Sequence, residues 1–326
     1  MKAVALFAAF VALAVNPLSA RDGQQPGPTF RSAAALVALN VTVQDGGSKF
    51  VPGLQPADFV VYEDGVKQTV EFFESTRVPV DLIVMLDTSA SMRDKLGLVH
   101  QAASGFLATL RPEDRGAVLS FASSVSVLQP LTSDHAALQR AVGDMHAGGS
   151  TSLNNAVYIA LKQFGLRAQS ADEVRRQAIV ILSDGADTTS LVSFDDVLAL
   201  ARRLPVSIYT VSLQSPPGVQ RTAATLPGRL EEEADYTMKT LAKETGAQSF
   251  FPTPDALKGV YAAIAAELAS QYSIGYVPAN TQADGRFRRV NVQVVTRPDL
   301  RSRTRLGYTA GAASSLLAAH NQGQER

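Results

Sequence analysis

Two carboxylates and two hydroxyls stand where buried strands are expected to end. Asp87, Ser89 and Ser91 follow an apolar run at a spacing of two residues, and Asp184 follows a second run further along the chain. On an extended loop, a spacing of two residues places side chains on one side of the chain. Carboxylate and hydroxyl oxygens suit Mg²⁺ or Ca²⁺ and do not suit zinc. These segments therefore predict an oxygen-ligand site for a divalent cation, provided that the fold brings them together.

A third polar segment reads Gly-Gly-Ser-Thr-Ser at residues 148–152. Its two glycines carry no side chain beyond hydrogen, so another loop can approach the backbone closely, and Thr151 adds a further hydroxyl. The three segments contain no histidine, and no base is placed to activate a nucleophile, so they favour binding over catalysis. The histidines of the chain stand without metal-ligand spacing at His100, His135, His146 and His320.

From residue 80 onward, apolar runs of strand length alternate with amphipathic stretches of helical period. This alternation predicts an α/β fold with a doubly wound, mostly parallel sheet covered by helices on both faces. In such a sheet, ligands bind beyond the carboxyl ends of the strands, where the three polar segments stand. The expected strands are 81–86, 116–122, 125–131, 177–183, 206–213 and 247–251, and the expected helices are 94–110, 134–145, 152–166, 193–204, 230–245 and 255–271.

Short strands are expected on both sides of this alternating region. Each flank is too small to bury a core alone, so we expect the two flanks to pair into one small β module. In the second flank, Arg301, Arg303 and Arg305 alternate and should share one solvated strand face, with contact to anionic glycans or lipid head groups as the alternative. The expected strands are 35–43, 59–62 and 67–73 before the alternating region, and 272–277, 287–295 and 301–308 after it.

The three polar segments, taken in order, resemble a von Willebrand factor type A domain with a metal-ion-dependent adhesion site. That family has Asp-x-Ser-x-Ser after its first strand, a threonine in a glycine-rich loop, and an aspartate before glycine after a later strand. This sequence reads Asp-Thr-Ser-Ala-Ser at 87–91, Gly-Ser-Thr-Ser-Leu at 149–153 and Ser-Asp-Gly at 183–185. Ser183 departs from the family, which more often has threonine there. The resemblance covers residues 79–270 or thereabouts.

The flanking sequences resemble a bacterial subfamily of proteins related to this domain and common in acidobacteria. The segments that carry this resemblance are LQPADFVVYEDGVKQTVEFF before the domain, and QYSIGYVPAN and RSRTRLGY after it. This resemblance implies an architecture and says little about function.

The family resemblance implies a role for each residue of the site. Ser89 and Ser91 would bind the metal directly, and Thr151 would join them in the ligand-ready state. Asp87 and Asp184 would act largely through water. Mg²⁺ is the implied ion, with Mn²⁺ or Ca²⁺ as alternatives, and its open position would take an Asp or Glu carboxylate from a partner protein, as in cell adhesion. The residues implied at the rim are Gly149, Gly185 and Asp187. For Asp187, the alternative to a role at the rim is that it is only an acid on a solvated loop.

The beginning of the chain has the pattern of an export signal. The positive residue Lys2 is followed by an apolar stretch that is too short for a comfortable membrane span, and the segment ends in the small residue Ala20. This pattern predicts cleavage after Ala20. It therefore predicts a secreted or periplasmic protein without an integral membrane span. An uncleaved anchor is the alternative.

The chain has no cysteine, which excludes disulfides, and its net charge of +0 gives no general attraction to nucleic acid. The expected organisation is a signal peptide at 1–20, a linker at 21–29, an N-terminal β module at 30–78, the von Willebrand domain at 79–271, C-terminal strands at 272–310 and a disordered tail at 311–326.

Four alternatives to metal-dependent adhesion stay open at this point. The loops could only cap helices, with Ser91 or Asp94 as the cap of the helix expected at 94–110. The metal could only stabilise a scaffold, or the chain could present substrate to a separate enzyme. An aspartic protease is the remote fourth, since such enzymes have Asp-Thr/Ser-Gly after an apolar run. However, Ser89 stands where that glycine is required, and strand–helix alternation does not suit an all-β protease.

Overall fold

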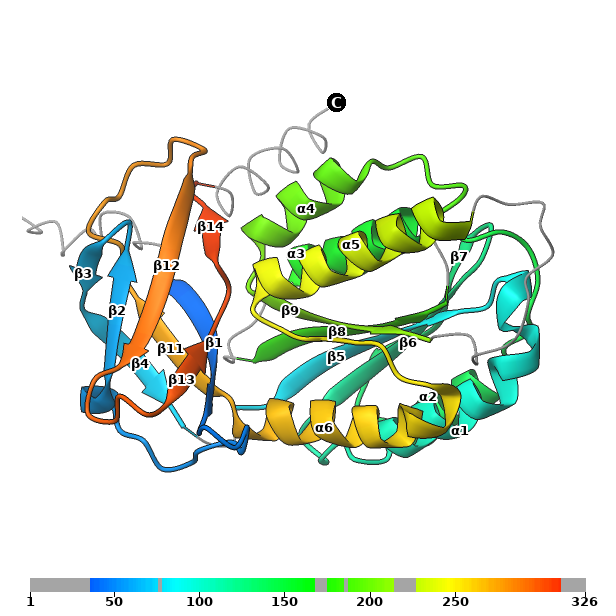
Figure 1. Ribbon diagram of the computed structural model, residues 1–326, viewed down its shortest axis with the longest axis horizontal. Helices are drawn as coiled ribbons and strands as arrows, with labels where there is room; N and C mark the ends of the chain where they lie inside the picture. Colours follow the sequence, from blue (N-terminus) through cyan, green and yellow to red (C-terminus); the bar gives the residue numbers. More distant parts are fainter. Residues whose placement is uncertain (1–35, 76–77, 168–174, 185–186, 214–226, 312–326) are drawn as a thin grey trace, which may run out of the picture. The chain divides into compact units, whose positions relative to one another are not determined.

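The computed structural model describes residues 36–75, 78–167, 175–184, 187–213 and 227–311 (Figure 1). Within these ranges no helix is both long enough and apolar enough to cross a membrane. The predicted signal peptide and linker, the tail beyond residue 311 and the rim residue Gly185 lie outside the described residues.

The centre of the fold is a six-stranded sheet with the order β10-β9-β8-β5-β6-β7. Adjacent strands run parallel except β6 and β7, which are antiparallel. Strand β5 lies between β8 and β6 and is buried along its whole length, as the apolar run at 82–86 predicts. The strands are β5 (Val80–Asp87), β6 (Arg115–Phe121), β7 (Val125–Thr132), β8 (Arg176–Ser183), β9 (Val206–Ser212) and β10 (Ser249–Phe250).

Helices cover both faces of this sheet, with α1, α2 and α6 on one face and α3, α4 and α5 on the other (Figure 1). The alternating side chains of β5 divide between the two cores, because Leu82 and Val84 pack on the first face while Ile83 and Met85 pack on the second. The predicted doubly wound α/β fold is therefore confirmed. The helices are α1 (Leu96–Leu107), α2 (His135–Gly143), α3 (Leu153–Arg167), α4 (Phe194–Arg203), α5 (Pro227–Thr245) and α6 (Leu257–Ser270), with short 3-10 turns η1 (Pro56–Asp58), η2 (Ala90–Lys95) and η3 (Pro254–Ala256).

The two flanks form a pair of four-stranded antiparallel sheets, ordered β13-β1-β11-β4 and β14-β12-β2-β3. In each sheet, strands from the N-terminal flank pair with strands from the C-terminal flank, namely β1 with β11 and β2 with β12. One apolar cluster takes side chains from both sheets, including Val41 and Ile274 from the first and Val61 and Val292 from the second. The strands are β1 (Val37–Gln44), β2 (Phe59–Glu63), β3 (Val66–Gln68), β4 (Val70–Glu74), β11 (Tyr272–Tyr276), β12 (Phe287–Val294), β13 (Arg301–Arg303) and β14 (Gly307–Thr309).

The predicted small β module is thus present, and it consists of two sheets around one apolar cluster. The division of the chain into domains at residues 78 and 271 stays a prediction.

The strand expected at 301–308 is broken, and the expectation of one solvated arginine face is wrong. Between β13 and β14, Arg305 is buried and donates hydrogen bonds to the carbonyl oxygens of Arg202 and Leu204. Arg303 forms an ion pair with the buried carboxylate of Glu267 at 2.7 Å. These arginines therefore join the flanks to the helices.

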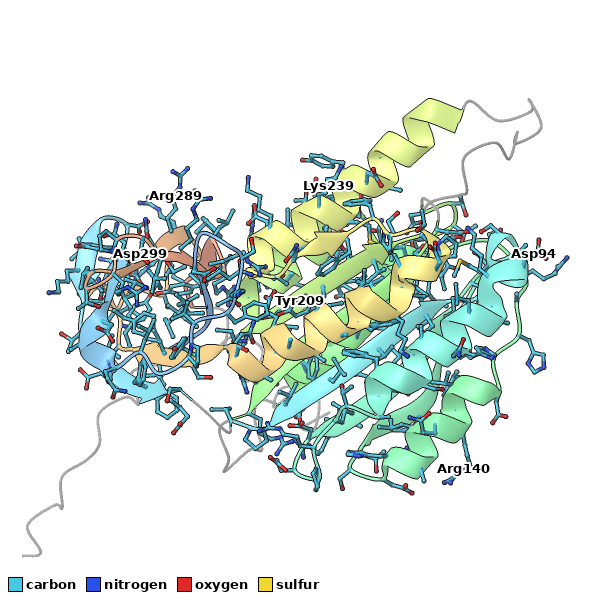
Figure 2. The ribbon with its side chains drawn as sticks, turned by 60° about the horizontal axis from the view of Figure 1, so that its bottom comes forward. Asp94, Arg140, Tyr209, Lys239, Arg289 and Asp299 are labelled. Atoms are coloured by element: carbon cyan, nitrogen blue, oxygen red, sulfur yellow. The ribbon has the colours of Figure 1, made fainter. Side chains whose placement is uncertain are left out.

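A buried polar cluster also joins the flanks to the central sheet. Glu267 on α6 accepts hydrogen bonds from Tyr209 on β9 at 2.8 Å and from Thr42 on β1 at 3.2 Å. The amide of Gln271 donates to the hydroxyl of Tyr209 at 3.0 Å. Figure 2 labels Tyr209 in the interior, and burial, followed by the nearby Glu267, raises its pKa.

Candidate functional site

Asp87 and Ser183 end two neighbouring parallel strands, β5 and β8, and their side chains meet. The Ser183 hydroxyl donates to Asp87 Oδ2 at 2.6 Å, and the backbone N–H of Ser89 donates to Asp87 Oδ1 at 2.8 Å. Asp87 is fully buried. Burial raises the pKa of this carboxyl, and its hydrogen bonds only partly oppose that effect. The first predicted ligand is therefore held by a hydroxyl and an amide at the carboxyl edge of the sheet.

A chain of hydroxyls continues from this carboxylate to Asp184 in the next loop. The hydroxyls of Ser89 and Ser91 lie 3.1 Å apart, and the Ser91 hydroxyl donates to Asp184 Oδ1 at 2.7 Å. Four of the five predicted ligands therefore form one connected group, namely Asp87, Ser89, Ser91 and Asp184. The hydrogen bond between Ser91 and Asp184 joins positions that are 93 residues apart in the sequence.

A lysine that sequence reasoning missed completes this group. Lys95 Nζ lies 2.5 Å from Asp184 Oδ2, and the side chains of Lys95 and Asp184 are 15% and 1% exposed. Lys95 ends the η2 turn, four positions after Ser91. Residues three apart share a face of a 3-10 turn, so the spacing of four from Ser91 gave no local signal that Lys95 would turn toward Asp184.

The glycine-rich loop packs directly on the first loop through backbone atoms. The N–H of Ala90 donates to the carbonyl of Gly149 at 3.0 Å, and the N–H of Gly148 donates to the carbonyl of Thr88 at 2.7 Å. Gly149 has a φ of 81°, and a Cβ atom there would lie 2.5 Å from the Ser123 hydroxyl. The positive φ and the nearby Ser123 side chain therefore favour glycine at position 149.

Thr151 and Asp187 tie the glycine-rich loop to the loop after β8. Thr151 is buried, and its carbonyl accepts hydrogen bonds from the N–H groups of Thr188 and Thr189. The carboxylate of Asp187 accepts from the N–H of Asn154 at 2.6 Å and from the N–H of Ser190 at 2.9 Å. Asp187 thus fastens its own turn and the first turn of α3. A further role for Asp187 at a metal rim stays a prediction.

The expectation that these loops only cap helices is wrong for the residues that it named. Ser89, and not Ser91, precedes η2, and Lys95, and not Asp94, precedes α1; neither makes a side-chain capping hydrogen bond. Asp94 lies in the η2 turn, points outward in Figure 2 and is exposed.

The donor set limits which metal these residues could hold. Across the described ranges, no three His, Cys, Asp or Glu side chains lie close enough to hold an ion. The oxygens that do converge belong to two carboxylates and two serine hydroxyls. Such donors fit a hard cation of the Mg²⁺ type, with water completing the shell, and exclude a zinc site built from histidine or cysteine.

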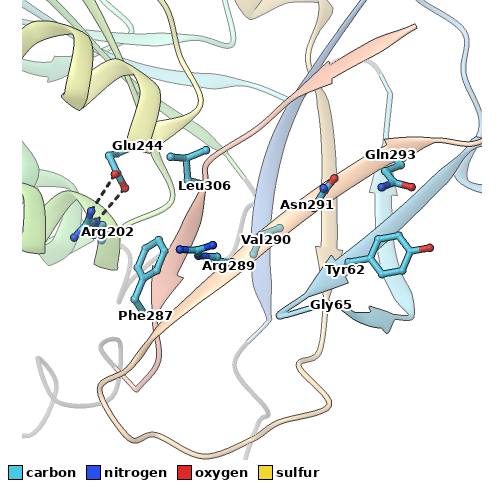
Figure 3. A pocket seen from close by; sticks show the side chains of 10 residues that line it. All are labelled: Tyr62, Gly65, Arg202, Glu244, Phe287, Arg289, Val290, Asn291, Gln293 and Leu306. Atoms are coloured by element: carbon cyan, nitrogen blue, oxygen red, sulfur yellow. Dashed lines mark hydrogen bonds and ion pairs between the residues drawn. The ribbon is translucent and has the colours of Figure 1, made fainter. Parts of the chain in front are cut away.

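A separate cavity of about 730 Å³ lies away from the strand-end loops (Figure 3). Its lining includes Phe287 and Asn291 on β12 and Arg202 and Glu244 on the helices. Arg202 forms an ion pair with Glu244 at 3.0 Å and lies 4.9 Å from the centre of the Phe287 ring. None of the predicted ligands lines it.

Comparison with known proteins decides the family. Residues 82–186 match the family model of the von Willebrand factor type A domain. The chain contains a von Willebrand factor type A domain. Domains of this type are in general interaction modules. The matched range includes the Asp-x-Ser-x-Ser loop, Thr151 and Asp184.

Bacterial relatives and solved structures share parts of this chain. An uncharacterized protein of Borreliella burgdorferi is 27% identical over 145 residues, 41% of each chain. A UPF0353 protein of Mycolicibacterium paratuberculosis is 26% identical over 220 residues, 61% of this chain and 63% of that protein. The chain thus spans less than two thirds of the length of these relatives.

Among solved structures, von Willebrand factor type A from Catenulispora acidiphila has a TM-score of 0.47 at 14% identity, covering 81% of this chain and 71% of that one. The vWF domain of the type V pili tip protein Mfa5 from Porphyromonas gingivalis has a TM-score of 0.44 at 14% identity, covering 58% of this chain and 94% of that one.

Proposed function

We propose that this protein binds a partner protein through Mg²⁺ at the carboxyl edge of its von Willebrand factor type A domain. Asp87, Ser89, Ser91, Thr151 and Asp184 would hold the ion, with Mn²⁺ or Ca²⁺ as alternatives. An Asp or Glu carboxylate of the partner would take the open position of the metal. The proposal makes the protein a non-enzymatic adhesion-type module.

The observation that supports this proposal is the continuous hydrogen-bonded group from Asp87 through Ser89 and Ser91 to Asp184. It joins oxygen donors from two loops that are far apart in the sequence. With Asp87 and Asp184 acting through water, the direct ligands would be neutral hydroxyls, so the charge of a bound Mg²⁺ would be only partly neutralised at short range. An anionic ligand from outside is then the natural completion of the shell.

The test is a titration of the purified full chain with Mg²⁺ and Mn²⁺ by isothermal calorimetry. Wild type should bind about one equivalent, and Ser91→Ala should bind at least about tenfold more weakly, since a hard-cation site loses a direct oxygen ligand. Ser91 is exposed, so this variant is expected to fold.

Ser150→Ala is the matched control, because Ser150 is an exposed hydroxyl in the glycine-rich loop beside Thr151. It should leave metal affinity unchanged. If wild type shows no binding, or if both serine variants weaken it equally, the proposal is wrong.

A second candidate is a structural module that needs no metal. It draws support from the ion pair between Lys95 and Asp184, because the charge of Asp184 is already balanced within the chain. Pull-down of secreted proteins with and without EDTA separates the two candidates, since only metal-dependent adhesion predicts a partner that EDTA releases.

Export is the setting in which we propose this binding takes place. The pattern of residues 1–20 supports secretion or a periplasmic location. Cell fractionation of a tagged chain tests this, and a cytoplasmic product of uncleaved length would contradict it.

A further inference from the structure

We infer that Lys95 is an internal cation that competes with the metal for Asp184 and so sets the metal affinity of the site. This inference rests on the proposed metal site and adds a residue that the family motif does not contain. Lys95 would act through Asp184, since it occupies one oxygen of a carboxylate that the bound metal needs.

The geometry shows that Asp184 is fully engaged by the chain itself. Its Oδ1 accepts from the Ser91 hydroxyl at 2.7 Å, and its Oδ2 lies 2.5 Å from Lys95 Nζ. The Asp184 side chain is 1% exposed, so solvent offers it little alternative solvation. The ammonium of Lys95 therefore balances the negative charge of this buried carboxylate, as a bound metal ion would otherwise do.

The ammonium and a divalent cation cannot share this place. Like charges a few ångströms apart repel strongly where water is largely excluded. The Ser91 hydroxyl is no obstacle to the metal, because it donates its hydrogen to Asp184 and keeps its oxygen lone pairs free. Metal entry thus requires Lys95 to leave Asp184 Oδ2.

Lys95 is placed so that it can leave. It ends the short η2 turn next to exposed Arg93 and Asp94, and 15% of its side chain already reaches solvent. Lysine carries its charge on a flexible four-carbon stem and is well hydrated when it swings outward. The site consequently has two arrangements, one with Lys95 on Asp184 and one with the metal.

The apparent affinity for metal then falls by the fraction of molecules in which Lys95 has withdrawn. Removing the ammonium should remove this competition. At the same time, the metal-free chain should become less stable, because Asp184 stays buried without its cation. If the Lys95 ammonium were only a surface charge, its removal would change neither the metal affinity nor the stability of the metal-free chain.

The experiment compares wild type with Lys95→Met and Lys95→Gln, by Mg²⁺ calorimetry and by thermal unfolding in EDTA. Both substitutions should tighten Mg²⁺ binding by about tenfold. Both should lower the melting temperature in EDTA, and Mg²⁺ should restore it. Lys95→Gln covers the case in which Lys95→Met does not fold, because the glutamine amide keeps a hydrogen-bond donor for Asp184.

The matched control is Arg93→Met, which removes the same charge from an exposed position on the same turn. It should change Mg²⁺ affinity by less than about twofold. Equal tightening by Arg93→Met, or unchanged affinity in both Lys95 variants, overturns the inference while leaving the metal site intact. Absence of Mg²⁺ binding in wild type and in both Lys95 variants instead overturns the proposed function.

Discussion

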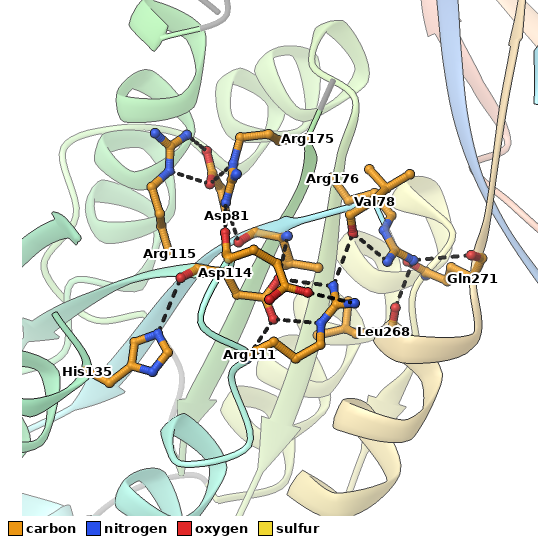
Figure 4. A network of polar contacts seen from close by, with 12 residues as sticks. Val78, Asp81, Arg111, Asp114, Arg115, His135, Arg175, Arg176, Leu268 and Gln271 are labelled. Carbon is orange, nitrogen blue, oxygen red and sulfur yellow. Dashed lines mark hydrogen bonds and ion pairs between the residues drawn. The ribbon is translucent and has the colours of Figure 1, made fainter. Parts of the chain in front are cut away.

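The two edges of the central sheet hold buried carboxylates in different ways. At the amino edge, drawn in Figure 4, the carboxylates meet guanidinium groups. Asp81 pairs with Arg115 at 2.6 Å and with Arg175 at 2.7 Å. Asp114 accepts three hydrogen bonds from Arg111, two from the guanidinium and one from the backbone N–H. Two carboxylates are thus matched by three arginines at this edge.

At the carboxyl edge, the carboxylates meet weaker partners. Asp87 accepts from the hydroxyl of Ser183 and from the N–H of Ser89, and Asp184 has one ammonium, that of Lys95. The pKa values follow the same division. Burial raises the pKa of Asp87. Burial acts in the same direction on Asp114, but the hydrogen bonds from Arg111 and from backbone N–H groups outweigh it and lower the pKa of that carboxyl.

This difference separates a cluster of carboxylates matched by guanidinium groups from one whose carboxylates have hydroxyl, amide and ammonium partners. Planar guanidinium groups bind carboxylates in fixed two-point geometry and leave no position open. Hydroxyls and a single lysine neutralise less charge and can rearrange. A sheet can therefore bury acids at both of its edges for different purposes. The groups that pair with each acid distinguish the two edges.

The largest expected effect tests this difference in stability directly. Asp81→Asn should lower the free energy of unfolding by about 3 kcal/mol or more, because it removes the buried carboxylate charge that forms ion pairs with both Arg175 and Arg115. Asp87→Asn should cost about 1 kcal/mol or less, since its hydrogen bonds come from neutral groups that an amide also accommodates. Urea unfolding in EDTA measures both.

The exposed acid Asp94 supplies the control for that pair. Asp94→Asn should stay within about 0.5 kcal/mol of wild type. Equal losses for Asp81→Asn and Asp87→Asn would remove the basis of the comparison between the two edges.

A smaller effect, dependent on pH, is expected at Asp114. Asp114→Asn should cost about 2 kcal/mol at pH 7, because charge-assisted hydrogen bonds from Arg111 and the amide of Val80 are lost. The folded-state pKa of Asp114 is lowered from its ordinary value of 3.8. Its stabilisation is therefore complete above that value and is lost as the pH falls through the folded pKa. The gap between wild type and Asp114→Asn should accordingly narrow below pH 4 or so.

Arg111→Met sharpens this test. In that background, Asp114→Asn should cost less than it does in wild type, because the two residues are direct partners. An Asp114→Asn effect that is constant from pH 7 to pH 2 would mean that the side chain acts through packing and not through its charge.

The periodicity of the sequence predicted the central sheet well because its inner strands β5, β6, β8 and β9 are largely buried and its helices are amphipathic. The rule that ligands lie at carboxyl strand ends then predicted which loops would meet, as Asp87 and Asp184 now illustrate. What sequence alone did not predict was the direction of long cationic side chains. Lys95 turns inward and Arg305 is buried, although both residue types usually stay in water.

Each of these misses depends on contacts between segments far apart in the chain. Arg305 lies where the expected strand breaks, so the alternation that predicted a shared face no longer applies. Its partners are carbonyls about 100 positions away. Lys95 meets a carboxylate 89 positions away. Local patterns carry no information on such partners until the topology is known.

A third effect, smaller than those at Asp81 and Asp114, concerns the backbone packing of the glycine-rich loop at the carboxyl edge. Gly149→Ala should cost about 1–2 kcal/mol, because a side chain at a φ of 81° is strained and its Cβ would lie 2.5 Å from the Ser123 hydroxyl. Unfolding in EDTA gives this cost. Gly148→Ala is the matched control, since a Cβ atom at Gly148 meets nothing within 4 Å.

The double variant Ser123→Ala with Gly149→Ala then separates the two sources of that cost. Removing the Ser123 hydroxyl relieves the collision but keeps the left-handed φ, and it also removes the hydrogen bond that the N–H of Ser150 donates to Ser123 at 2.9 Å. Stability should therefore recover only in part. Since Ala90 and Thr88 bond the backbone of this loop, the strained loop should also weaken Mg²⁺ binding, whereas Asp81→Asn at the other edge should leave that affinity unchanged. If Gly149→Ala and Asp81→Asn changed metal affinity alike, the two edges would not be independent, and metal binding would report only the general stability of the sheet.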